Sequence, residues 1–178
     1  MMLIKILTSR KFHIYTCVII YTCVLLTCLF LGYNSSQENC SQETICADLN
    51  FSNRVLLFTK LLVNNEKCII QNYGGIFSIG LLSIASVIRN ASAFGFVLGA
   101  AIQNGNYLQI FLHVFPHSFE AIAFLLACAD SAYLGIIVFL KIICNYHLKI
   151  KFSLYVIRFL YYLVITALAA LVEAFISI

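Results

Sequence analysis

The chain has 178 residues, of which 62% are hydrophobic and 10% are charged, and its formal net charge is +4. A soluble domain is nearer half apolar and a quarter charged, so this composition excludes an ordinary water-soluble globule. The basic residues lie scattered at the ends of apolar runs, which argues against a nucleic-acid partner and is typical of membrane proteins. The sequence therefore predicts an all-α, polytopic helical membrane bundle of about five transmembrane helices, with the lipid bilayer as its surroundings.

The first apolar run, residues 12–33, follows a short basic start. It is long enough to cross a bilayer, and it is longer than the apolar region of a secretory signal peptide. No small-x-small cleavage site follows it, so residues 1–33 are predicted to be a cytoplasmic N-terminus and a first transmembrane helix. A signal peptide is the alternative.

Residues 34–67 form the most polar part of the chain and are predicted to be an extracytoplasmic region with an amphipathic helix. Ser52 or Asn53 is the expected cap of that helix, which would lie at the membrane interface or pack on the bundle. The apolar residues at helical spacing are Phe51, Val55, Leu56, Phe58, Thr59, Leu62 and Val63. Cys40, Cys46 and Cys68 allow a disulfide between two of the three if the compartment is oxidising.

Residues 68–178 are predicted to form the membrane bundle, with apolar stretches at 68–88, 118–140 and 152–176. The stretch Ala91–Phe115 is interrupted by Gln103–Asn106. It is interpreted either as one span with a polar kink or as a broken, re-entrant element. Five crossings place most basic residues on the side of the N-terminus, which predicts a multi-pass cell-membrane protein with a cytoplasmic N-terminus and an extracytoplasmic C-terminus.

The polar residues around Pro116 are the most distinctive candidates for a site. A helix that begins at Pro116 would place His117 and Glu120 on one face, where they form a structural cap or an ion, proton or ligand site. His113, His117 and Glu120 could also bind zinc. However, Pro116 separates the two histidines, and the H-E-x-x-H pattern of zinc proteases is absent. We therefore expect no metal, no cofactor and no enzyme activity.

Other polar and small residues within the apolar runs are expected to hold the bundle together. Asp130 is predicted to pair with Arg89 or Arg158, with a role in a proton path as the alternative. The small residues expected to allow close helix packing are Gly74, Gly75, Gly80, Gly95, Gly99 and Ala100.

Together these residues resemble the stage II sporulation protein M family. The resemblance covers roughly Asn64 to Gly135, and it departs from the family pattern at Asn90-Ala91 and at Pro116-His117-Ser118, where the family has glycine as the last residue. The segments that carry it are Asn64-Asn65, Gly74–Gly80, Arg89-Asn90, Gly95, Gly99 and Phe115–Glu120.

The resemblance implies a polytopic protein of about five spans, without catalysis of its own. The namesake of the family scaffolds a peptidoglycan-degrading complex during engulfment, and other members resemble export or immunity components of circular bacteriocin clusters. The leading hypothesis is a scaffold or assembly component with membrane-protein partners, in which the motif has a structural or partner-binding role. That motif consists of Asn64, Asn90, Pro116, His117 and Glu120. An export, transport or bacteriocin-immunity component is the alternative, an intramembrane metalloenzyme comes third, and a homo-oligomer stays open.

Overall fold

The computed structural model describes residues 6–35, 51–103, 105, 107–145 and 150–176, and five long helices make up most of this part of the chain. The helices are α2 (Arg10–Ser35), α3 (Phe51–Gly74), α4 (Leu81–Gln103), α5 (Tyr107–Cys144) and α6 (Phe152–Ile176). No strand occurs within these ranges. The predicted all-α membrane bundle is therefore confirmed.

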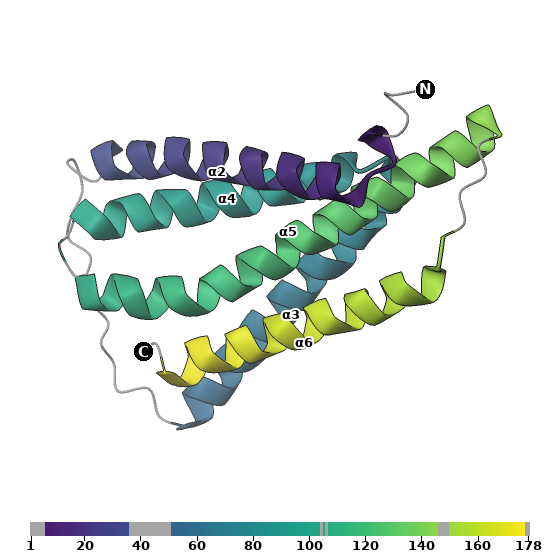
Figure 1. Ribbon diagram of the computed structural model, residues 1–178. Helices are drawn as coiled ribbons and strands as arrows, with labels where there is room; N and C mark the ends of the chain where they lie inside the picture. The colour runs from purple at the N-terminus through teal and green to yellow at the C-terminus, as the bar shows by residue number, and fades with distance from the viewer. Residues whose placement is uncertain (1–5, 36–50, 104, 106, 146–149, 177–178) are drawn as a thin grey trace.

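Consecutive helices run in alternating directions through the bundle (Figure 1). α2 packs along α4, and α3 packs along α6. α5 contacts all four of the other helices, so it is the central element. Glu120 and Asp130, both on α5, are therefore buried where α5 packs against the other helices.

Four of the helices, α2, α4, α5 and α6, are long and apolar enough to cross a membrane. α3 has the length of a crossing, but it carries Arg54, Lys60, Glu66 and Lys67. It includes the predicted amphipathic helix and continues past it to Gly74. α3 begins at Phe51, so the expected caps Ser52 and Asn53 already lie inside the helix, and that part of the prediction was wrong.

The stretch 68–88, predicted to be one span, is divided by a chain reversal. The short 3-10 helix η1 (Gly75–Ser78) ends α3, and α4 begins at Leu81. Gly80 has a φ of 88°, a left-handed conformation that glycine adopts without strain. Ile79 has a φ of 55°, which is unusual for a β-branched residue. A Cβ at Gly75 would overlap the hydroxyl of Ser83. Hydropathy did not reveal the reversal because apolar residues continue on both sides of it.

The stretch Ala91–Phe115 is neither a kinked span nor a re-entrant element. Its first part completes α4, its last part begins α5, and Gly105 lies between them with a φ of 73°. Gly105 therefore marks a turn between two helices that run in opposite directions.

Small residues bring α2 and α4 into close contact, as expected for Gly95 and Gly99. A Cβ at Gly99 would overlap the backbone carbonyl of Leu29, and a Cβ at Gly32 would overlap that of Phe96. Such contacts between backbones are typical of helices that associate in membranes. Gly74 was expected to act in the same way, but a Cβ at this position would meet no atom of the described residues within 4 Å.

We predict that Gly99→Ala separates α2 from α4 and lowers stability, because the new methyl group has no space beside the carbonyl of Leu29. Overpacking of this kind costs about 1–3 kcal/mol. Thermal unfolding in detergent should show a lower midpoint for Gly99→Ala. Gly74→Ala is the matched control and should unfold with the wild type; equal midpoints for all three proteins would contradict the proposed packing.

Candidate functional site

Three helices contribute to a polar cluster around Glu120, which is 3% exposed. The side-chain amide of Asn65 on α3 donates a hydrogen bond to Oε1 of Glu120. Nδ1 of His117, one turn earlier on α5, lies 3.1 Å from Oε2. The ring of Phe94 on α4 lies against His117, with 4.0 Å between the ring centroids. Both carboxylate oxygens are therefore occupied, and the cluster links α3 to α5.

The structure brings His117 and Glu120 together at the predicted spacing, but their partner is Asn65 and not Asn64. Asn64 is exposed, whereas Asn65 is buried. The two residues are adjacent and chemically identical, so only the rotation of α3 distinguishes them. The carboxylate of Glu173 on α6 is close enough to interact electrostatically with Glu120 and His117.

Pro116 lies inside α5, although the sequence predicts that a helix begins there. Proline breaks one helical hydrogen bond, but membrane helices tolerate this where neighbouring groups compensate. Pro116 is fully buried, and α5 continues through it from Tyr107 to Cys144. Tertiary packing therefore overrides the local preference for a helix boundary.

His113, the third member of the candidate zinc set, is on the same helix, but its side chain lies outside the described part of the structure. Within the described part, no three His, Cys, Asp or Glu side chains form a group that could hold a metal ion. Cys40 and Cys46 also lie outside it, whereas Cys68 is a buried free thiol.

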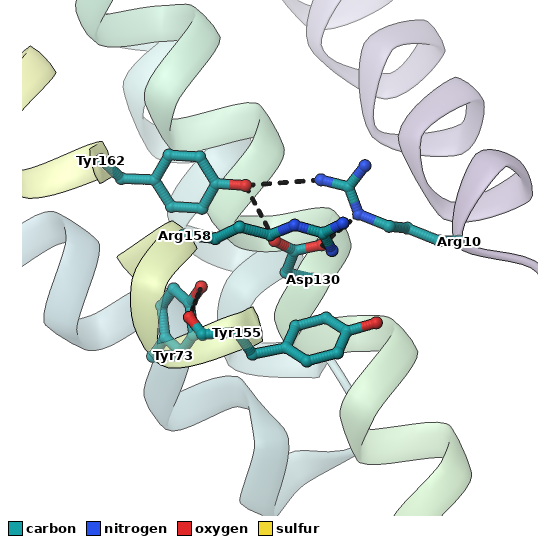
Figure 2. A network of polar contacts seen from close by, with 6 residues as sticks. All are labelled: Arg10, Tyr73, Asp130, Tyr155, Arg158 and Tyr162. Carbon is teal, nitrogen blue, oxygen red and sulfur yellow. Dashed lines mark hydrogen bonds and ion pairs between the residues drawn. The ribbon is translucent and has the colours of Figure 1, made fainter. Parts of the chain in front are cut away.

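A second polar cluster surrounds Asp130, which is fully buried in α5 (Figure 2). Nε of Arg10 on α2 donates to Oδ1 of the carboxylate, and Nη1 of Arg158 on α6 lies 3.5 Å from the same oxygen. The hydroxyl of Tyr162 donates to Oδ2 over 2.8 Å. The guanidinium of Arg158 also lies over the ring of Tyr155. One carboxylate thus joins α2, α5 and α6.

Of the two partners predicted for Asp130, the structure places Arg158 beside it and Arg89 elsewhere. Arg10 occupies the remaining position. The sequence reasoning missed Arg10 because it belongs to the basic start of the chain, where a cation ordinarily marks membrane orientation and not a buried pair.

Arg89 lies in a groove between α3 and α4, together with two residues of the motif, Asn64 and Asn90. The groove has a volume of about 250 Å³. Arg89 donates to Oε1 of Gln71 over 3.3 Å. The full set of lining residues is Asn64, Lys67, Cys68, Gln71, Arg89, Asn90 and Ala93. The motif is therefore divided between a closed cluster at Glu120 and this open groove.

Comparison with known proteins identifies a family. The family model described as Stage II sporulation protein M matches residues 16–178. No curated protein and no solved structure matches the chain.

We predict that Glu120→Ala destabilises the protein, because it leaves the buried amide of Asn65 and the ring of His117 without their acceptor. An orphaned buried polar group costs about 1–3 kcal/mol. The free energy of unfolding in detergent measures the effect. Glu66→Gln, a change at a partly exposed acid on α3, is the control and should be near neutral. A neutral Glu120→Ala would show that the cluster does not hold α3 to α5.

Asp130→Asn should have a larger effect, since it leaves two arginines in the bundle without a counter-charge. Breaking one side of a buried ion pair costs about 3–5 kcal/mol. Tyr162→Phe removes a single hydrogen bond from the same carboxylate and should cost about 1 kcal/mol. Unfolding measurements on both variants should show this order, and the reverse order would contradict the proposed charge pairing.

Proposed function

Because the chain belongs to the Stage II sporulation protein M family, we propose that it is a non-catalytic scaffold or assembly component of a membrane-associated complex. Each oxygen of its two buried carboxylates has a side-chain partner, and this supports the proposal. Glu120 is occupied by Asn65 and His117, and Asp130 by Arg10, Arg158 and Tyr162. Groups held in this way fix the positions of helices, and a fixed bundle can present a surface to a partner.

The observation that carries the proposal is an exposed polar stripe on α3. We call Asn53, Lys60 and Asn64 the α3 polar face; they are all exposed on one side of α3, which also includes the exposed Leu56 between Asn53 and Lys60. α3 runs alongside α6, which is apolar enough to span a membrane. A lysine and two amide side chains are costly where a helix faces lipid chains. A partner that supplies polar groups would remove this cost.

The chemistry of the face favours a different protein over a second copy of this chain. In a symmetric pair with its axis along the membrane normal, α3 would meet its own copy, and Lys60 would face Lys60. Like charges repel strongly in a medium of low dielectric constant. We therefore assign the α3 polar face to a partner membrane protein whose helix presents acidic or amide side chains.

We predict that a photoreactive residue at Leu56 crosslinks the chain to a different membrane protein. Leu56 is 55% exposed and lies one turn from Lys60, so the substitution leaves the α3 polar face intact. The same residue at Val97 on α4, which is 66% exposed, is the matched control and should contact lipid alone. Crosslinking in native membranes, followed by mass spectrometry, identifies the products.

Lys60→Gln should reduce the crosslink from Leu56 without lowering the amount of protein. Equal products from Leu56 and Val97, or a product made of two copies of this chain, would contradict the assignment.

A function in export, transport or bacteriocin immunity is the second candidate. Its basis is the presence of ionisable residues, Glu120 and Asp130, inside the bundle, since such residues at membrane depth often mark ion or substrate pathways. Under this function, Glu120→Gln, which keeps the shape of the side chain, should abolish substrate flux or protection in cells at unchanged protein levels. Unchanged flux in this variant would exclude Glu120 from a pathway.

A further inference from the structure

We propose that the groove between α3 and α4 binds a phosphate group, carried either by the headgroup of an anionic phospholipid or by free phosphate. This inference goes beyond the scaffold function, since it concerns a small anionic ligand. The groove shares only Asn64 with the α3 polar face.

The lining of the groove supplies positive charge and hydrogen-bond donors and contains no acid. Lys67 contributes an ammonium from α3, and Arg89 contributes a guanidinium from α4. Neither forms an ion pair within the described ranges, where the ion pairs involve Asp130 and Glu120. Arginine offers five donors in a planar fork that suits phosphate, and lysine adds a compact point charge. Two cations without a counter-charge therefore face the same space.

Asn90, which also lines the groove, carries a donor without a partner among the described residues, whereas Arg89 already donates to Gln71. The amide nitrogen of Asn90 is buried and makes no hydrogen bond there. A buried donor of this kind is costly unless a ligand or water accepts from it. Asn90 follows Arg89 on α4, and both residues line the groove with Lys67. A phosphate bound by the two cations would therefore lie close to Asn90.

The dimensions and depth of the groove suit a headgroup. Its volume of about 250 Å³ is roughly eight times the share of one water molecule in the liquid, which is about 30 Å³. Lys67 and Arg89 lie seven and eight residues from the helix ends that meet at the α3–α4 reversal, or about 10–12 Å along the axes. Long basic side chains extend over part of this depth toward the interface, and basic pockets between membrane helices bind anionic headgroups.

The test uses the full chain, purified in detergent. Native mass spectrometry with equal amounts of phosphatidylglycerol and phosphatidylcholine measures lipid binding, and thermal unfolding with sodium phosphate against sodium chloride at equal ionic strength measures the effect of free phosphate. We expect preferential retention of phosphatidylglycerol. Loss of both cations in Lys67→Gln/Arg89→Gln should weaken this binding about 25-fold, at about 1 kcal/mol for each basic residue.

Three further variants separate binding from folding and from partner capture. Asn90→Ala removes the unpaired donor, so it should weaken binding without lowering stability. Lys67→Arg keeps the charge and should retain the lipid. Lys60→Gln lies outside the groove and should bind phosphatidylglycerol as the wild type does, whatever it does to partner crosslinking.

Selective lipid retention without an effect of phosphate supports a lipid headgroup, whereas thermal stabilisation by phosphate, lost in Lys67→Gln/Arg89→Gln, supports a free phosphate site. Equal retention of the two lipids together with no effect of phosphate would overturn the proposal. So would undiminished binding in both Asn90→Ala and Lys67→Gln/Arg89→Gln, or a partner protein found in the groove.

Discussion

The organisation of this protein depends on the cost of leaving a polar group unsatisfied at membrane depth. α5 carries two carboxylates, at positions 120 and 130, and each is satisfied by side chains from neighbouring helices. Their separation of ten positions corresponds to about 15 Å along the helix. α5 is therefore joined to α3 at Glu120 and to α2 and α6 at Asp130. The directional contacts at these two positions fix the rotation of α5 relative to those three helices.

Apolar packing complements these two polar contacts. Glycines let the C-terminal half of α2 approach the backbone of the C-terminal half of α4. α3 is attached differently, through Asn65 to α5 and along its length to α6. α3, the least apolar of the helices, is thus held by a directional hydrogen bond to α5 and by packing on α6. The side of α3 that carries Lys60 and Asn64 stays exposed.

The sequence predicts the class of fold because composition and run length depend directly on the bilayer. It predicts the pairing of His117 with Glu120 because both lie on one helix at a spacing of three. It does not predict the reversal at Gly75–Ser78, since hydropathy is similar before and after it. Nor does it identify Asn65 or Arg10 as partners of the carboxylates, because those contacts join residues 55 and 120 positions apart and depend on how the helices are rotated.

The polarity of α3 also has a consequence for how the chain enters the membrane. A lysine or arginine at the centre of a membrane helix costs about 2.5–3.5 kcal/mol during insertion, and α3 has Arg54, Lys60 and Lys67. Transfer of α3 alone from the translocation machinery into lipid would therefore be unfavourable. α6, the helix it packs along, is synthesised only after α4 and α5. We infer that α3 stays at the insertase or at the membrane surface until α6 has also emerged, so that α3 reaches its final position after its neighbours along the chain.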